Sequence, residues 1–397
     1  MPWWHTISDL KKAKQTKNDE FYTQISDIEN ELKHYKEHFK WKTVFCNCDD
    51  PYESNFFKYF AANFNFLWLK KLIATWYSTS PIAFTQLPLF EIKWLENEKP
   101  RAYKIEINEV YDANKDWAVN LADVEYLLKT WKWKNKLTLL KWDWDFRSKE
   151  SIELLKQADI VVTNPPFSLF REYIAQLMEY NKKFVIIGNM NAITYKEVFP
   201  LIKENKIWTW FKHFWGWMNM IFPKNLFNSE KVKKYTIDDN WNYIVNIMWV
   251  IWYTNLDITK RHENLILYKN YNEKNYPKYD NYKAIEVSTT ASIPCDYDGV
   301  MWVPITFLDK YCPEQFEILW LAPERLSENE ATLQIKRYIN AIQHKDDWTV
   351  CSWNKVNDWP VIVHDKIPNK FPYYTSETVP NKYLEVLYAR ILIRRKK

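Results

Sequence analysis

The run from Asp159 to Phe167, near the middle of the chain, has the residue types of a site that grips an amino group. It reads DIVVTNPPF, so an apolar strand ends in Asn164-Pro165-Pro166-Phe167. The two prolines fix the backbone and carry no N–H donor, which leaves the Asn164 side-chain oxygen and the Pro165 carbonyl as outward-facing acceptors. Two acceptors on one planar amino group would aim its nitrogen lone pair at an electrophile, and Phe167 would offer a stacking surface. The alternative is a structural Asn-Pro turn before a helix.

The segments around this run alternate between strand-like and helix-like patterns up to about residue 205. Strand-like runs occupy 42–48, 70–75, 103–108, 136–140, 159–163 and 182–188. Helix-like runs occupy 25–39, 54–64, 121–130, 150–158, 168–180 and 194–205, the last bent or broken at Pro200. Strands separated by helices of this length indicate a doubly wound parallel α/β sheet, in which ligands bind at the carboxyl ends of the strands. The Asn-Pro-Pro-Phe run stands at such an end.

The pattern changes beyond about residue 205, where short apolar runs mix with polar segments rich in Pro and Tyr. The most apolar run, 243–256, is too short to span a bilayer and predicts one or two buried strands. We therefore expect two domains, residues 1–205 and 206–397, of which the second is richer in β-structure.

The composition is that of a globular protein. Hydrophobic residues make up 47% and charged residues 26% of the 397 residues, which is ordinary for a soluble chain. The five cysteines lack zinc or disulfide spacing, and the N-terminal residues lack the apolar core of a signal peptide. We therefore expect a cytoplasmic protein that needs no membrane and no metal. The basic runs 11–17 and 389–397 fit solvated termini as well as contacts to nucleic-acid phosphates.

A strand followed by Asn-Pro-Pro-Phe resembles the catalytic motif of amino-methyltransferases that use S-adenosylmethionine. The flanking segments are similar to the EcoRI-type adenine-specific DNA methyltransferases of type II restriction-modification systems. They read DIVVTNPPFSLFREYIAQLMEY, FVIIGNMNAITYKEVFPLIKENKIW, DYDGVMWVPITFLDKY and ARILIRRKK. The similarity covers nearly the full chain and weakens in about 322–380.

The resemblance implies a Rossmann-like S-adenosylmethionine-dependent methyltransferase sheet in residues 1–205 and a β-rich target-recognition region in residues 206–397. It implies a monomer that acts on double-stranded DNA and methylates adenine at N6. The target adenine must leave the duplex, because its amino group is otherwise buried in a base pair. Asn164 and Pro165 would hold that amino group, Pro166 would keep the turn rigid, and Phe167 would stack on the flipped base.

Three further segments correspond to cofactor-binding segments of the family: DEFYTQ (19–24), VFCNCDDP (44–51) and WDF (144–146). The first would close over the cofactor, the second would lie by its methionine part, and the third would bind its adenine ring. The implied cofactor-binding residues are Phe21, Tyr22, Thr23, Asp50, Pro51, Asp145 and Phe146. An ordinary helix lead-in remains the alternative for the first segment, and a helix N-cap for Asp50. The strand 70–75 ends without an acidic residue, so the partner of the ribose hydroxyls is unassigned.

The chain has 23 Trp and only 3 Gly, whereas average usage would give roughly 28 glycines. Several tryptophans follow Asp or Asn where a glycine would make a tight turn, at Asp116-Trp117, Asp143-Trp144, Asn240-Trp241, Asp347-Trp348 and Asp358-Trp359. Such turns need a positive φ, which glycine adopts freely. We hypothesise that many of these tryptophans are glycines in the native protein, encoded by UGA codons that the source organism reads as glycine. Trp208 and Trp252 stand in apolar strings and are expected to be true tryptophans. The alternative is a tryptophan-rich protein.

Two other functions stay open at this level. The motif would also grip the amide of a glutamine or the amine of an RNA base, as in a glutamine or RNA amino-methyltransferase. A non-catalytic DNA-binding relative that kept the fold and lost the cofactor is the second alternative. The similarity of the C-terminal half to a DNA-modifying family speaks against the first, and binding of S-adenosylmethionine separates the second.

Overall fold

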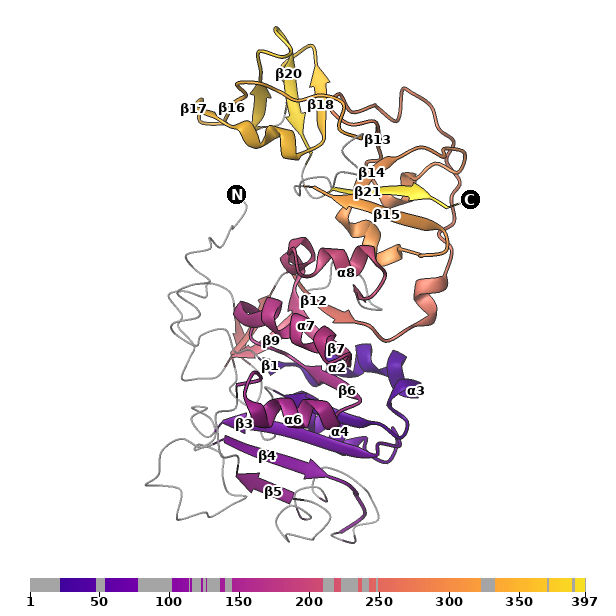
Figure 1. Cartoon of the computed structure of the whole chain (residues 1–397), viewed down its shortest axis with the longest axis vertical. Helices are drawn as coiled ribbons and strands as arrows, with labels where there is room; N and C mark the ends of the chain where they lie inside the picture. Colours follow the sequence, from indigo (N-terminus) through magenta and orange to yellow (C-terminus); the bar gives the residue numbers. More distant parts are fainter. Residues whose placement is uncertain are drawn as a thin grey trace. The chain divides into compact units, whose positions relative to one another are not determined.

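The protein was analysed as a computed structural model, which describes most of the chain in several ranges. These are residues 22–47, 54–77, 102–113, 115, 123, 126, 136–139, 145–209, 218–222, 235–237, 243–247, 249–322, 333–369, 371–387 and 390–396. The chain divides into two compact units (Figure 1). The first unit is Met1–Val198 with Ile207–Ile258, and the second is Phe199–Lys206 with Thr259–Lys397.

An eight-stranded sheet forms the centre of the first unit, in the order β5-β4-β3-β2-β6-β7-β12-β8. The strands are β2 (Thr43–Asn47), β3 (Lys71–Tyr77), β4 (Ala102–Ile107), β5 (Lys136–Leu139), β6 (Ile160–Thr163), β7 (Lys183–Asn189), β8 (Trp208–Thr209) and β12 (Val250–Thr254). The inner strands β3, β2, β6 and β7 run parallel to one another. Strands β4, β5, β12 and β8 pair antiparallel. The α/β class is confirmed, whereas a wholly parallel sheet is wrong at both edges, because apolar periodicity marks a strand but not its direction.

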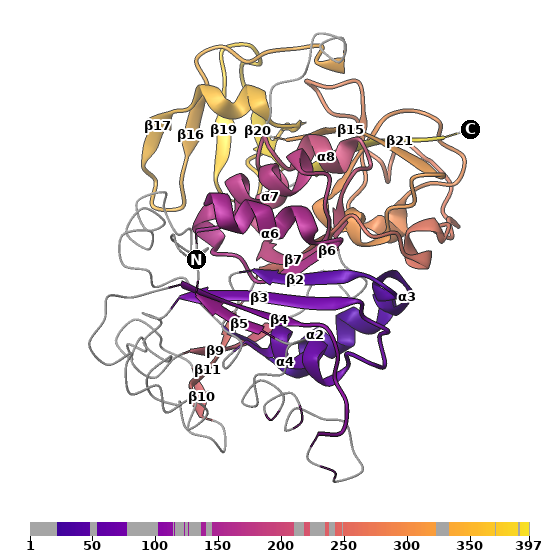
Figure 2. The same ribbon diagram turned by 60° about the horizontal axis from the view of Figure 1, so that its bottom comes forward.

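Helices lie on both faces of this sheet. Helices α6 (Lys149–Gln157) and α7 (Phe170–Glu179) cover one face, and α2 (Ile25–Leu32) and α4 (Asn55–Ala62) cover the other (Figure 2). Every residue of β2 and β6 is buried as a result, which is typical of central parallel strands. This explains why both strands are mostly apolar in the sequence.

Two of the expected helices differ in extent. The helix expected over 25–39 is divided into α2, a 3-10 turn at Lys33–Tyr35 and α3 (Lys36–Phe39). The helix expected over 194–205 is α8 (Phe199–Lys203), which begins one residue before Pro200. Proline is tolerated in the first turn of a helix, where its missing N–H has no intrahelical partner. Of the helix expected over 121–130, only Asp123 and Tyr126 are described, and both are helical.

A small antiparallel sheet completes the first unit, in the order β1-β9-β11-β10. Its strands are β1 (Tyr22–Thr23), β9 (Met218–Phe222), β10 (Thr236–Ile237) and β11 (Tyr243–Ile247). The apolar run 243–256 therefore gives two strands, of which β12 is buried in the central sheet. Because β8 and β12 extend that sheet, the first unit continues to Ile258, beyond the boundary expected at residue 205.

The second unit is rich in β-structure, as expected. Its first sheet has the order β13-β14-β21-β15, formed by Ile285–Glu286, Met301–Pro304, Arg390–Arg395 and Phe316–Leu321. Its second sheet has the order β17-β16-β19-β20-β18, formed by Val350–Ser352, Ile342–His344, Tyr373–Thr375, Tyr383–Val386 and Val361–His364. The second sheet lies between β15 and β21 in the sequence and has a core of its own around Tyr374 and Leu384.

The basic run at the C-terminus is strand β21 and serves the fold. Arg390 pairs with the buried Glu286 at 2.7 Å, and Arg394 pairs with Glu317 at 2.6 Å. Burial raises the pKa of Glu286, and the guanidinium of Arg390 opposes this effect. Two arginines of the run therefore form ion pairs within the fold, and the other basic run, 11–17, lies outside the described residues.

Candidate active site

The predicted motif leaves the central sheet at the carboxyl end of β6. Strand β6 lies between β2 and β7 and parallel to both. Phe167, the last residue of the motif, begins a 3-10 turn (Phe167–Leu169) that leads into α7. The order of strand, tetrapeptide and helix is therefore confirmed. Pro165 is buried, and Asn164, Pro166 and Phe167 are half-buried. The Asn164 Oδ1 atom lies beneath the surface, where a hydrogen bond is stronger than in water.

Buried polar groups tie this end of β6 to β2 and α7. The Thr163 hydroxyl donates to the carbonyl of Asn47, the last residue of β2. The Tyr173 hydroxyl of α7 donates to Asn47 Oδ1 at 2.7 Å. All three residues are buried. The strand end that leads toward Asp50 is thus fixed directly beside the strand end that leads into Asn164.

The Asp145-Phe146 loop, which precedes α6, is held against the same helix. Phe146 is buried, and its ring lies edge-on to the ring of Tyr173 with centroids 5.1 Å apart. The Gln176 side-chain amide donates to the Phe146 carbonyl at 3.0 Å. Helix α7 therefore contacts the predicted adenine-binding loop and also carries the predicted amine-binding motif at its beginning.

Asp145 forms an ion pair with the neighbouring Arg147. Arg147 donates to Asp145 Oδ1 through its backbone N–H and its Nε, each at 2.8 Å, and to Oδ2 through Nη2 at 2.5 Å. The hydrogen bonds from the Arg147 side chain lower the pKa of Asp145. Arg147 also contacts Glu172 of α7 at 2.6 Å. A carboxylate accepts about four hydrogen bonds, and the described residues supply three of them to Asp145.

The segment expected to close over the cofactor is strand β1. Thr23 pairs with Met220 of β9, and its carbonyl accepts a hydrogen bond from the Asn55 side chain at 2.7 Å. Asn55 is the first residue of α4, the helix that follows the segment containing Asp50. Thr23 is buried, and within the described part of the chain its hydroxyl has no hydrogen-bond partner.

The structure thus brings together most of the predicted site that it describes. The ends of β2 and β6 and the Asp145 loop meet around α7, and β1 lies at the beginning of α4. Phe21, Asp50 and Pro51 lie outside the described residues, as does the side chain of Tyr22. Sequence reasoning missed Asn47, Tyr173 and Gln176. The only signal was that Tyr173 and Gln176 stand three positions apart on the face of a helix expected to be buried, where a polar side chain needs a hydrogen-bond partner.

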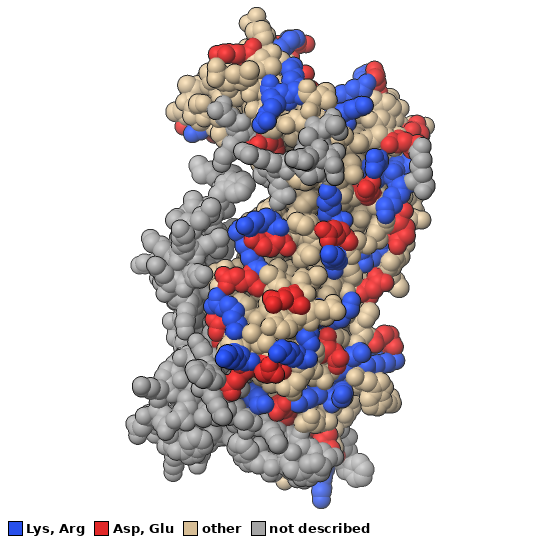
Figure 3. All heavy atoms as spheres, viewed as in Figure 1, with Lys and Arg blue, Asp and Glu red and all other residues tan. Residues whose placement is uncertain are grey.

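The surface gives no single-sign patch in the view of Figure 3. Acidic and basic side chains are interspersed over the described part of that face. No helix among the described residues has the length and apolar character to cross a bilayer. Within the same residues, no group of three metal-binding side chains is placed to hold an ion.

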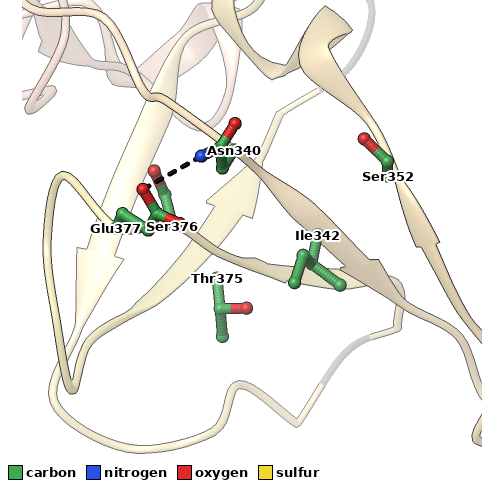
Figure 4. A pocket seen from close by; sticks show the side chains of 6 residues that line it. All are labelled: Asn340, Ile342, Ser352, Thr375, Ser376 and Glu377. Carbon is green, nitrogen blue, oxygen red and sulfur yellow. Dashed lines mark hydrogen bonds between the residues drawn. The ribbon is translucent and has the colours of Figure 1, made fainter.

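A shallow pocket of about 560 Å³ lies on the second sheet of the second unit (Figure 4). The Asn340 amide at its edge donates to Glu377 at 3.0 Å. Its lining residues are Asn340, Ile342, Ser352, Thr375, Ser376 and Glu377. None of the predicted site residues belongs to it.

The sequence of the chain is similar to one protein family and to several known methyltransferases. The family model described as adenine-specific methyltransferase EcoRI matches residues 9–396. The type II methyltransferase M.EcoRI of Escherichia coli is 49% identical over 315 residues, which cover 78% of this chain and 88% of that protein. M.MgeORF184P of Mycoplasma genitalium is 40% identical over 322 residues (78% and 85%), and M.MpnI of Mycoplasma pneumoniae is 34% identical over 319 residues (78% and 84%). No solved structure matches the chain.

Proposed function

The chain belongs to the EcoRI adenine-specific methyltransferase family, and we propose that it methylates the N6 amino group of a flipped adenine in double-stranded DNA. The methyl donor is S-adenosylmethionine, and the enzyme is the modification partner in a restriction-modification system. The observation that carries the proposal is the position of Asn164 and Pro165. They stand at the carboxyl end of a central parallel strand, directly before the helix that contacts the Asp145 loop.

The chemistry follows from the two acceptors. Asn164 Oδ1 and the Pro165 carbonyl accept the two hydrogens of the N6 amino group and so orient the nitrogen lone pair away from the ring plane. Phe167 stacks on the base and fixes its plane, and Pro166 keeps the turn rigid. Once N6 has accepted the methyl group it carries a positive charge and readily loses one of its protons to water, so no strong base is needed.

The described cofactor residues fit S-adenosylmethionine. When bound, this cofactor supplies an electrophilic methyl carbon on a sulfonium sulfur. The Asp145 carboxylate would accept a hydrogen bond from the cofactor's adenine amine, and Phe146 would pack against the adenine ring. The buried Thr23 hydroxyl is available to a polar group of the cofactor. Phe21, Tyr22, Asp50 and Pro51 complete the proposed site from the flanking segments.

We assign DNA recognition to the C-terminal half, expected over 206–397, and chiefly to the second unit. Its β-rich sheets are separate from the central sheet, which the first unit completes by itself. We further propose that the enzyme acts in the cytoplasm as a monomer and requires no metal ion. The proposed amine-binding and cofactor-binding residues all belong to one unit, which supports a site that is complete within a single chain.

The decisive experiment replaces Asn164 by Ala. Methyl transfer to adenine in duplex DNA should be lost, while calorimetry should show unchanged binding of S-adenosylmethionine. Asn30→Ala on α2, outside the site, is the control and should keep full activity. Methyl transfer near the wild-type rate by Asn164→Ala would overturn the assignment.

The same assay separates the alternatives. Transfer to RNA or to glutamine-containing peptides in place of duplex DNA would identify another amino-methyltransferase. A protein that binds duplex DNA but not S-adenosylmethionine would be the non-catalytic relative. The names of the relatives, all type II methyltransferases, favour DNA.

A further inference from the structure

Helix α7 carries two buried polar side chains that the proposed chemistry does not use. Tyr173 and Gln176 are both buried. Apolar residues at these positions would pack without the cost of burying a hydroxyl and an amide. Their hydrogen bonds go to other elements, since Tyr173 reaches Asn47 at 2.7 Å and Gln176 reaches Phe146 at 3.0 Å.

These contacts join the three loops of the proposed site. Asn47 is the last residue of β2, before the segment with Asp50, and Phe146 follows Asp145. The Thr163 hydroxyl adds a bond from the residue before Asn164 to the Asn47 carbonyl. Helix α7 itself begins only three residues after Phe167. A displacement of this helix would therefore move the amine-binding motif relative to both cofactor loops.

We infer that Tyr173 and Gln176 are positioning residues that keep the binding sites for the methyl donor and the target amine aligned with each other. The inference rests on the proposed function. Methyl transfer requires the nitrogen and the methyl carbon to be aligned about 3–3.5 Å apart, and a displacement of about 1 Å can cost on the order of a hundredfold in rate. Neither side chain touches the reacting atoms. They act through Asn47 and Phe146.

The test is Tyr173→Phe, which keeps the ring contact with Phe146 and removes only the hydroxyl. We expect kcat to fall about tenfold and the Kd for S-adenosylmethionine to rise about fivefold, because loop placement changes. The Kd for duplex DNA should stay the same. Tyr180→Phe, half-buried at the end of the same helix, is the matched control and should match the wild type in all three quantities.

A double-mutant cycle distinguishes positioning from a general loss of stability. If Tyr173 acts through Asn47, then Tyr173→Phe combined with Asn47→Ala should be no worse than Asn47→Ala alone. Additive losses, or a melting temperature that falls while kcat per folded molecule stays normal, would overturn the inference. Gln176→Glu keeps an acceptor but no amide donor, so it should resemble Gln176→Leu in kcat.

The two proposals fail in different ways. If the wild type binds S-adenosylmethionine but does not methylate DNA, the proposed function fails, and the fivefold change in Kd still decides the role of Tyr173. If the wild type is active and Tyr173→Phe has wild-type kcat and Kd, the positioning role alone is wrong.

Discussion

The backbone N–H of Trp41 donates to the carbonyl of Trp68 at 2.8 Å, and both residues hold a left-handed backbone, with φ of 58° and 53°. Trp41 lies between α3 and β2, and Trp68 lies between α4 and β3. Both indoles are exposed, by 65% and 55%. Left-handed residues after a helix are usually glycine, because a Cβ is crowded in this conformation. Two equivalent turns before neighbouring parallel strands thus carry tryptophan where glycine fits.

Other tryptophans also test the hypothesis that some tryptophans stand for glycines encoded by UGA. Trp249 and Trp348 also have positive φ, 67° and 61°, which confirms the turn expected at Asp347-Trp348. The turn expected at Asp358-Trp359 is wrong, because Trp359 is extended with φ of −127°. Trp252 is 1% exposed within β12, as expected of a true tryptophan. The turns at Trp117, Trp144 and Trp241 lie outside the described residues.

Replacing Trp249 by Gly should stabilise the protein. The residue is 44% exposed and left-handed, so the change relieves backbone strain of roughly 1 kcal/mol, and we expect this gain to exceed the packing lost with the indole. Denaturant unfolding should show a free energy of unfolding higher by about that amount.

Trp252→Gly is the matched control, three residues further along the chain. It empties a buried site beside Phe56 and should cost about 3–5 kcal/mol. The gene should carry TGA at position 249 and TGG at position 252. TGG at all four left-handed tryptophans would contradict the hypothesis.

Gly188→Ala should weaken both stability and activity. A Cβ on Gly188 of β7 would lie 2.4 Å from Cε2 of Phe170, the first residue of α7. Phe170 is buried and packs on Tyr253 with ring centroids 5.0 Å apart. The ring therefore cannot yield without moving the helix that follows the amine-binding motif. We expect a loss of about 1–3 kcal/mol on unfolding and a lower kcat.

Gly299→Ala serves as the control for that substitution. Its Cβ would meet the end of the Tyr297 ring at 2.5 Å, but Tyr297 is only half-buried and can turn aside. Equal losses for the two variants would show that the approach of Phe170 to Gly188 has no special role.

Thr23→Val should lower the affinity for S-adenosylmethionine without destabilising the fold. The hydroxyl is buried and has no partner among the described residues, so its replacement by a methyl costs the free protein little. Loss of one hydrogen bond to the cofactor should raise the Kd about tenfold in calorimetry.

Thr209→Val in β8 is the matched control, since its hydroxyl is likewise buried and, in the described structure, without a partner. This variant should keep the wild-type Kd. The same Kd for all three proteins would remove Thr23 from the cofactor site.

Arg147→Ala should change the pH dependence of stability by a small amount. Arg147 lowers the pKa of Asp145 below its ordinary value of 3.8. The ion pair therefore stabilises the fold fully above that value, and its contribution is lost as the pH falls through the lowered pKa. Because Arg147 is half exposed, the difference at neutral pH should be less than about 1 kcal/mol.

Melting curves of the two proteins from pH 7 to pH 3 would measure this effect. The difference between the two curves should shrink as the pH falls below about 3.8. A difference that widened as the pH fell would contradict the ion pair.

The sequence by itself determined the six strands β2 to β7 of the central sheet, helices α4, α6 and α7, and the Asn-Pro-Pro-Phe motif that follows β6. These features depend on local pattern: a buried parallel strand such as β6 is mostly apolar, and Pro165 and Pro166 fix their own turn. The left-handed turn at Trp348 was also predictable from the sequence, because a pair that resembles Asp-Gly is a local signal for a tight turn. The family resemblance supplied the roles of these segments.

Only the tertiary structure decided how the strands pair and which distant residues meet. The antiparallel direction of β4 and β12 depends on how their connections return to the sheet, and strand periodicity is the same in both directions. The hydrogen bond of Tyr173 to Asn47 joins residues 126 positions apart, and that of Arg390 to Glu286 joins residues 104 apart. Such partners are chosen by burial, because a buried polar group must find whichever complementary group the fold brings near it.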